Sequence, residues 1–186
     1  MVMPAFLRFP NEAAIIGRLL AGYAELEIDL LHCVSVARGD FDAVLKAMFR
    51  ARGETRRIDV GDALGRQLYH RLKLGTEFEM AIGAMRYCLR IRNQYAHCIW
   101  YDDNTGELAF TDLEEIAKEN AFLKDLRSLT ILHVDVPLLE SQEYFFAYAD
   151  KFLSWVNFEG RTRSGEFEQN RIDKPKQQKQ PLLHCP

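Results

Sequence analysis

The amino-acid sequence predicts an all-α fold, a helical bundle of five or six helices with a small β-hairpin inserted after the fourth helix. Apolar residues recur at helical spacing through most of the chain, and one short stretch switches to the alternation of a hairpin. Glycine, proline and capping residues stand where the helical patterns begin and end. The 186 residues are 48% hydrophobic, enough for one domain with a core, which excludes disorder over most of the chain.

Local signals bound the predicted helices. Pro10 opens the first helix, Gly39 ends it, and Asp40 is placed to cap the second. The fourth and fifth helices each begin at a capping box, in which Thr is followed three residues later by Glu. The two boxes are Thr76 with Glu79 and Thr111 with Glu114. The predicted helices cover residues 10–38, 41–53, 55–74, 76–97, 111–126 and 137–158.

The hairpin is predicted between the fourth and fifth helices. Ile99–Tyr101 and Leu108–Phe110 are short apolar runs on either side of the turn-forming residues Asp103–Gly106. Residues 130–136 are rich in β-branched side chains, which favours a further extended segment. The sequence therefore predicts a small β insertion in a helical protein.

Charge and composition divide the chain into a body and a tail. Residues 1–158 are predicted to form a single domain, and residues 159–186, rich in Arg, Gln, Lys and Pro, a disordered tail. The tail holds 6 basic and 4 acidic residues, and the body holds the remaining 18 and 23, so their net charges are +2 and −5. Residues 46–73 contain eight basic and three acidic residues, a positive stretch that either attracts phosphates or is a solvated helix face.

Several functional classes are disfavoured. Every apolar run is interrupted by charge well before the roughly 18 residues of a membrane span, so no membrane partner is expected. Residues 1–4 lack the pattern of a secretion signal, which predicts a cytoplasmic protein. No phosphate-binding loop or Gly-x-Ser-x-Gly motif supports a small-molecule hydrolase. The cysteines are widely spaced, so we expect reduced thiols, no metal site and no cofactor. They are Cys33, Cys88, Cys98 and Cys185.

Two charged residues interrupt apolar helix faces. Arg92 falls in the middle of the apolar stripe of the fourth helix, and Glu27 falls in that of the first, whereas Glu25 and Asp29 lie toward its polar side. An unpaired charge in an apolar site costs several kcal/mol, so each group must be paired, hydrogen-bonded or facing a wet cleft. One interpretation is a structural ion pair between Glu27 and Arg92, and the other is a functional role for Arg92.

A second face of the fourth helix carries basic and polar side chains. Arg86, Arg90, Asn93 and His97 follow one another at steps of 4, 3 and 4 residues, which aligns them along one side of a helix. Such a row of donors beside an imidazole is suited to phosphate, so Arg86 and Arg90 are the candidate RNA-binding residues. The alternative is a solvated face with a histidine near the helix end.

The run Arg92-Asn93-Gln94-Tyr95-Ala96-His97, near the end of a helix in a helical domain, resembles the mark of the HEPN superfamily. The resemblance implies a metal-independent endoribonuclease that works as a homodimer, with a role as a toxin or stress effector. Arg92, Asn93 and His97 would be its catalytic residues. His97 would move protons at the ribose 2′-hydroxyl and leaving oxygen, Arg92 would stabilise the phosphate, and Asn93 would orient one of them.

The sequence differs from that of some members of this superfamily. Some HEPN toxins carry a Tyr two residues after the His, which a partner antitoxin modifies, but that position here is Ile99 and the nearest tyrosine is Tyr101. On an ideal helix Arg92 and His97 point about 140° apart, so they converge only past the helix end or across a dimer. The alternative function is a non-catalytic dimeric interaction or scaffold module whose hairpin, through Trp100 and Tyr101, contacts a protein partner.

Overall fold

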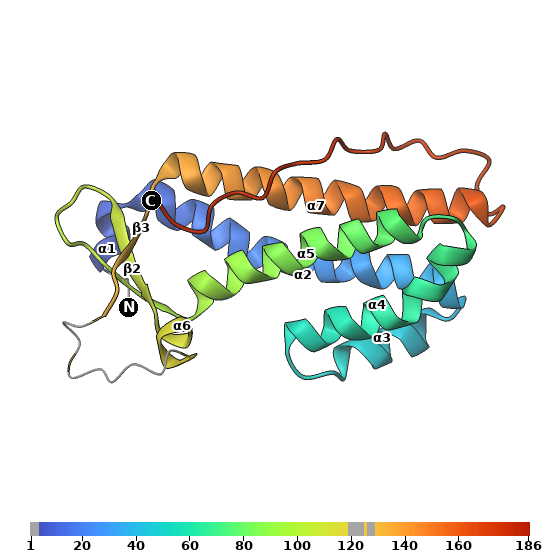
Figure 1. Ribbon diagram of the computed structural model, residues 1–186, viewed down its shortest axis with the longest axis horizontal. Helices are drawn as coiled ribbons and strands as arrows, with labels where there is room; N and C mark the ends of the chain where they lie inside the picture. The colour runs from blue at the N-terminus through green and yellow to red at the C-terminus, as the bar shows by residue number, and fades with distance from the viewer. Residues whose placement is uncertain (1–3, 119–124, 126–128) are drawn as a thin grey trace. The chain divides into compact units, whose positions relative to one another are not determined.

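The computed structural model describes residues 4–118, 125 and 129–186, and Figure 1 traces the chain through them. The helices are α1 (Pro4–Arg8), α2 (Pro10–Arg38), α3 (Phe41–Phe49), α4 (Glu54–Arg71), α5 (Gly75–Ala96), α6 (Leu113–Lys118) and α7 (Val136–Arg163). The strands are β1 (Cys98–Tyr101), β2 (Leu108–Asp112) and β3 (Leu132–Val134). Within these residues no helix is both long and apolar enough to cross a membrane.

The chain forms two compact units. The first, here called the sheet unit, comprises Met1–Ala21, Arg90–Tyr144 and Gln180–Pro186. The second, the helical unit, comprises Gly22–Leu89 and Phe145–Lys179. The boundaries between them fall within the helices α2, α5 and α7.

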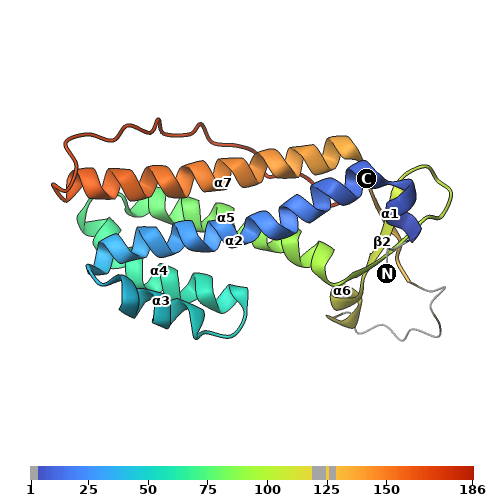
Figure 2. The same ribbon diagram turned by 180° about the vertical axis from the view of Figure 1, so that it is seen from behind.

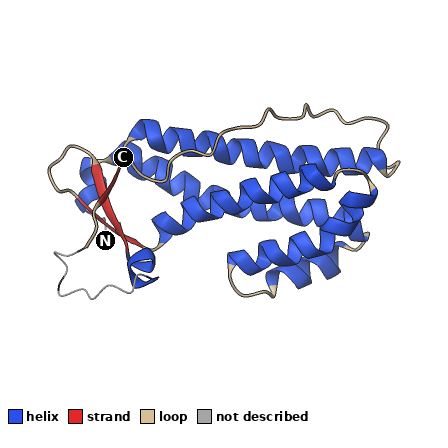
Figure 3. Ribbon diagram, viewed as in Figure 1, coloured by secondary structure: helices blue, strands red, loops and turns tan. Residues whose placement is uncertain are grey.

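The sheet unit contains the predicted hairpin and one more strand, drawn in red in Figure 3. The strand order is β1-β2-β3, with both pairs antiparallel. Leu108, Ala109 and Phe110 of the central strand β2 are fully buried, because this strand is covered by its neighbours and by the core. The predicted extended segment 130–136 is confirmed as β3. The described chain is therefore mostly helical with a three-stranded sheet, and the expectation of a purely all-α fold is corrected to this extent.

The predicted capping box at Thr111 is wrong. Thr111 lies in β2, fully buried, and its hydroxyl contacts Tyr101 and donates to the carbonyl of Thr130 at 3.1 Å. Asp112 begins the next helix instead, because its Oδ1 accepts the backbone N–H of Glu114 at 2.9 Å. The helix so begun is α6, described over Leu113–Lys118, within the predicted helix 111–126. Residues 119–124 and 126–128 of that prediction lie outside the described residues.

The first predicted helices are confirmed with their end signals. The helix α2 spans residues 10–38, and Gly39 follows it with φ of +66°, a left-handed conformation that favours glycine. Asp40 caps α3, since its Oδ1 accepts the N–H of Ala43 at 3.0 Å. By contrast, α5 begins at Gly75, one residue before the predicted cap Thr76.

The helical unit includes α3 and α4, which lie side by side (Figures 1 and 2). Two glycines of α4 allow close packing of large side chains. A Cβ at Gly61 would lie 2.8 Å from the Leu30 side chain, and one at Gly65 would lie 2.7 Å from the ring of Phe78. That ring stacks on Tyr69 with centroids 4.5 Å apart. Gly61 and Gly65 are therefore contact points of α4 with the core.

The predicted tail begins at residue 159, but the structure places residues 159–163 in α7, and the disorder of the remaining residues stays a prediction. The helix α7 continues to Arg163, and beyond it Asn170 donates from Nδ2 to the Trp155 carbonyl at 3.2 Å. Lys174 pairs with Glu77 at 3.0 Å and lies 5.0 Å from the centroid of a Trp155 ring. Composition indicates how much apolar surface a segment can bury. It does not indicate single polar contacts such as those of Asn170 and Lys174.

Candidate functional site

The Arg92–His97 run lies in the sheet unit, where α5 ends and β1 begins. Arg92 is half-buried on the last turns of α5, and its Nη1 donates to Oδ1 of the neighbouring Asn93 at 3.1 Å. Since α5 ends at Ala96, His97 lies just past the helix end, and its side chain is 47% exposed. On an ideal helix the side chains of an Arg and a His five residues apart point in different directions, but a His past the helix end is not held to that direction.

The surroundings of these side chains suit phosphate chemistry. The amide oxygen of Asn93 holds the Arg92 guanidinium, whose planar fork matches two phosphate oxygens. The Nε2 of His97 lies 3.8 Å from Oε1 of Glu114, too far for a hydrogen bond, so the carboxylate is the acidic neighbour of the imidazole. Sequence reasoning read Glu114 only as a capping residue, because nothing in its spacing indicates that α6 brings it back to His97.

The middle of the run faces the core. Gln94 and Tyr95 are 7% and 3% exposed, and the Tyr95 hydroxyl donates to Oε1 of Gln142 at 2.6 Å. Burial raises the pKa of Tyr95 well above its ordinary value, so its phenol stays protonated and acts as a donor. Two residues of the motif therefore serve packing and hydrogen bonding, while Arg92, Asn93 and His97 have access to solvent.

Glu27 is buried as expected, and its observed partner is Arg57 of α4. Glu27 is 6% exposed, and its two carboxylate oxygens accept hydrogen bonds from Arg57 Nη1 at 3.1 and 2.9 Å. The Arg57 guanidinium also lies 5.3 Å from the ring centroid of Phe49. Glu27 belongs to the helical unit and Arg92 to the sheet unit, so a structural ion pair of Glu27 with Arg92 stays a prediction. Helical periodicity identifies a buried charge, but it does not select its partner.

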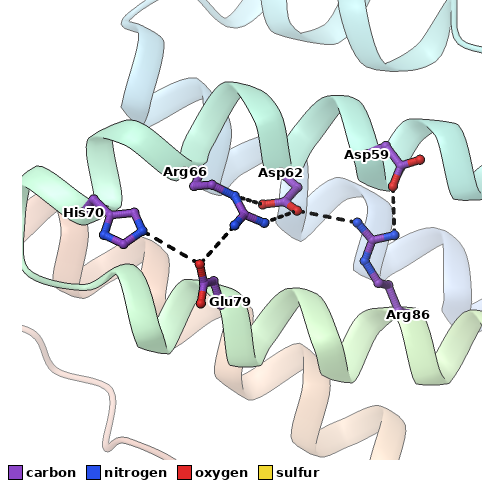
Figure 4. A network of polar contacts seen from close by, with 6 residues as sticks. All are labelled: Asp59, Asp62, Arg66, His70, Glu79 and Arg86. Carbon is purple, nitrogen blue, oxygen red and sulfur yellow. Dashed lines mark hydrogen bonds and ion pairs between the residues drawn. The ribbon is translucent and has the colours of Figure 1, made fainter.

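Arg86, one of the two predicted RNA-binding residues, is engaged by acids of α4 (Figure 4). Its Nη1 lies 2.8 Å from Asp59, and its Nη2 lies 3.5 Å from Asp62. Asp62 also pairs with Arg66 at 2.7 Å, so these side chains form one network between α4 and α5. A guanidinium neutralised in this way is a weaker phosphate ligand than a free one.

The same network continues toward the end of α4. Arg66 donates to Oε1 of Glu79 at 3.0 Å, and the His70 Nε2 lies 3.8 Å from the same oxygen (Figure 4). Glu79, predicted to complete a capping box, is therefore an ion-pair partner. Arg90, the other predicted RNA-binding residue, is exposed in the sheet unit, and no acid of the described residues forms an ion pair with it.

The positive stretch 46–73 separates into paired and unpaired residues. Lys46, Arg57 and Arg66 each pair with an acid. The exposed side chains at the turn from α3 to α4 have no ion pair with any described acid. They are Arg50, Arg52 and Arg56, here called the basic corner, and the turn is visible in Figure 2. Sequence charge alone located the region, and the structure identifies which of its cations are available.

The hairpin aromatics pack within the sheet unit. The Trp100 ring lies with its centroid 5.4 Å from that of Phe6, 5.7 Å from Tyr95 and 5.3 Å from Phe110. The hydroxyl of Tyr101 is hydrogen-bonded to Thr111. These contacts occupy the two side chains that were expected to meet a protein partner.

One group of side chains in the sheet unit has the spacing of metal ligands. Glu107, Asp135 and Cys185 each offer one ligand atom, and these atoms lie within 4.8 Å of one another. Partial burial, and then the two carboxylates, raise the pKa of the Cys185 thiol. The thiol is therefore protonated at neutral pH, which makes it a poor metal ligand until a cation displaces the proton.

No protein-family model matches this chain, and no curated protein or solved structure matches it either. The functional assignment therefore depends on the residues of the site and on their geometry.

Proposed function

We propose that the protein is a HEPN-like, metal-independent endoribonuclease. The observation that supports this best is the position of His97, which lies beyond the end of α5, half-exposed, after a helical turn that carries an Arg92 held by Asn93. A helix-embedded arginine with a solvent-accessible imidazole just past the helix end supplies a phosphate ligand and a group that transfers protons near neutral pH. A toxin or stress effector is the biological role that this activity suggests.

The proposed reaction needs no metal because the nucleophile is part of the substrate. His97 accepts the proton of the ribose 2′-hydroxyl, the 2′-oxygen forms a bond to phosphorus, and the bond from phosphorus to the 5′-oxygen breaks. A protonated imidazole gives the leaving 5′-oxygen its proton, while Arg92 stabilises the extra negative charge on the phosphoryl oxygens. The products are a 2′,3′-cyclic phosphate and a 5′-hydroxyl.

A homodimer completes the proposal. A single imidazole transfers both protons only by turning over between them, whereas two copies of the run facing each other supply one base and one acid. Because each site then needs His97 of both copies, excess His97→Ala protein mixed into the native protein should lower the activity per native chain as mixed dimers form. Activity per native chain that stays unchanged although mixed dimers form contradicts a shared site.

RNA binding is proposed for Arg90 and for the basic corner, in place of Arg86. Free guanidiniums neutralise backbone phosphates, and each phosphate contact to a single strand contributes about 0.7 to the slope of log K against log salt. Replacing the three arginines of the basic corner by Gln is expected to reduce this slope by about 2. The matched control is Arg66→Gln, because Arg66 is already paired with Asp62. Equal slopes for the triple variant and the native protein contradict the proposed contact.

The activity is tested with the full chain and a fluorescent single-stranded RNA in excess EDTA. We expect cleavage by the native protein and a loss of at least about 100-fold in His97→Ala, the range seen for a lost general acid or base. His32→Ala is the matched control, since His32 is an exposed histidine of the helical unit. Full cleavage by His97→Ala removes the proposed mechanism.

A second candidate is the non-catalytic dimeric interaction or scaffold module. Exposed large apolar side chains on the sheet unit favour it, because such side chains commonly mark protein contacts. They are Leu7, Ile99, Leu113 and Ile131, each at least 41% exposed. Under this proposal, changing Ile99 and Ile131 to Ser disrupts a dimer or a protein complex, an antitoxin included, in analytical ultracentrifugation, and no RNA is cut.

A further inference from the structure

The segment Pro181–Cys185 lies in the sheet unit with alternating exposure, and its backbone bends at Leu183 and His184. Leu183 is half-buried, as are Pro181 and Cys185, whereas Leu182 and His184 between them are exposed. The segment therefore lies with alternate side chains against the protein surface.

Two buried glutamines of the sheet unit hold the main chain of this segment. Gln94 of α5 donates from Nε2 to the carbonyl of Leu183 at 2.8 Å. Gln142 of α7 donates to the carbonyl of Leu182 at 2.8 Å and to that of Leu183 at 3.2 Å. Gln142 is fully buried and Gln94 is 7% exposed. Buried amides need hydrogen-bond partners, and here the partners of their N–H groups are peptide carbonyls.

Tyr95 determines which way the Gln142 amide faces. The Tyr95 hydroxyl donates to Oε1 of Gln142 at 2.6 Å, so the Nε2 donors must point toward the segment. Burial raises the pKa of the Tyr95 phenol, so the hydroxyl keeps the proton that it donates to Gln142. The surface thus presents preoriented N–H donors to two consecutive carbonyls and reads no side chain of the segment through them.

The segment also forms one main-chain hydrogen bond to the sheet. The backbone N–H of Cys185 donates to the carbonyl of His133 at 2.8 Å, and His133 lies in β3, the edge strand of the order β1-β2-β3. An edge strand exposes main-chain donors and acceptors to which a further extended chain can bind, a common mode of peptide recognition. The glutamines and the β3 edge therefore hold the same segment by its main chain.

We propose that Gln94, Gln142 and the edge of β3 form a binding site for the main chain of a peptide, which the segment Pro181–Cys185 occupies as an exchangeable ligand. Recognition through carbonyls and one N–H tolerates different side chains, so the same segment of a second copy fits the site equally well. Covalent attachment gives the resident segment an effective concentration in the millimolar range, which a free peptide at similar concentration can match. This proposal is independent of RNA cleavage.

The thiol of Cys185 reports whether the segment is bound. Docking half-buries the thiol and places it beside Asp135 and Glu107, which raises its pKa and slows its reaction with disulfide reagents. Labelling of the full chain, assigned to each cysteine by mass spectrometry, separates Cys185 from the other thiols. Release of the segment therefore appears as faster labelling of Cys185.

The test adds an unlabelled peptide of residues 180–186, with Cys185→Ser, to the native full chain. We expect the labelling rate of Cys185 to rise saturably, by about tenfold at millimolar peptide, whereas the same peptide made of D-amino acids leaves the rate unchanged. A rate that does not respond to the L-peptide, or responds equally to both peptides, overturns the exchangeable site.

A variant tests the glutamine contacts independently. Gln142→Met keeps the side-chain volume but removes the donors to Leu182 and Leu183, and we expect it to speed Cys185 labelling by about tenfold, as for two lost neutral hydrogen bonds. Gln67→Met, at an exposed position of α4, is the matched control. An unchanged rate in Gln142→Met, in a protein with native circular dichroism, also overturns the proposal.

Discussion

Replacing Asp29 by Asn is expected to reduce the pH dependence of the protein's stability. Asp29 of α2 is half-buried and shares a hydrogen bond with Asp150 of α7, and its Oδ2 is buried with no partner among the described atoms. Burial, followed by the hydrogen bond and negative charge of Asp150 and the charge of Glu25, raises the pKa of Asp29 to about 8. The native protein therefore holds a proton that the two carboxyls share.

The sign and size of the effect follow from linkage. Between an unfolded pKa of about 4 and a folded pKa of about 8, the native state binds a proton that the unfolded state has lost. The free energy of unfolding then falls as pH rises, by at most ~1.4 kcal/mol per pH unit. The full contribution is present below pH ~4 and is lost as pH rises through about 8. Because Asp150 is exposed and solvent screens the pair, we expect a total of about 2 to 3 kcal/mol.

Denaturant unfolding at pH 5 and at pH 8.5 measures this difference. Asn cannot ionise, so the stability of Asp29→Asn relative to the native protein should rise by about 2 kcal/mol between the two pH values. Glu25→Gln, at an exposed neighbouring acid, should shift the same comparison by well under half as much. Parallel pH profiles for the native protein and Asp29→Asn would refute the buried shared proton.

Two further substitution pairs test the packing of the helical unit. Gly65→Ala places a methyl group 2.7 Å from Phe78 and should cost about 1 to 3 kcal/mol in thermal or denaturant unfolding, whereas Gly83→Ala, with no neighbour within 4 Å, should stabilise by about 0.5 kcal/mol. If Gly65→Ala is no less stable than Gly83→Ala, the close contact of α4 with Phe78 is contradicted. Arg57→Met removes the ion-pair partner of the buried Glu27 carboxylate and should cost about 2 to 4 kcal/mol, with Glu27→Gln costing clearly less; equal costs contradict a buried charge pair.

The helices were predictable where local chemistry decides them. The bounds of α2 and the cap of α3 follow from a glycine at positive φ and from Asp40, both of which act within a few residues. Thr111 failed as a cap because tertiary pairing in β2 outweighed its local preference. The path of residues 164–186 was not predictable from composition, because it depends on single contacts such as that of Asn170 with the Trp155 carbonyl.

For the candidate site, the sequence predicted which charged residues interrupt apolar helix faces, but it did not predict which residues lie beside them. The out-of-pattern charges Glu27 and Arg92 are indeed buried and half-buried, respectively. Arg57, the partner of Glu27, and Glu114, which lies near His97, come from other helices, and no period within one helix indicates them. Asp29 was assigned to a polar face, and its approach to Asp150 likewise depends on how α2 and α7 pack in the helical unit.

The chemical ends of the cleaved RNA test the central claim most directly. The full chain is incubated in EDTA with an RNA and with the same RNA carrying 2′-O-methyl groups, and the products are identified by mass spectrometry. Attack by the 2′-oxygen, with His97 as proton carrier, predicts 2′,3′-cyclic phosphate and 5′-hydroxyl ends, and no cleavage of the methylated strand. Intact RNA, products with 5′-phosphate ends, or cleavage of the methylated strand would contradict the proposed endoribonuclease.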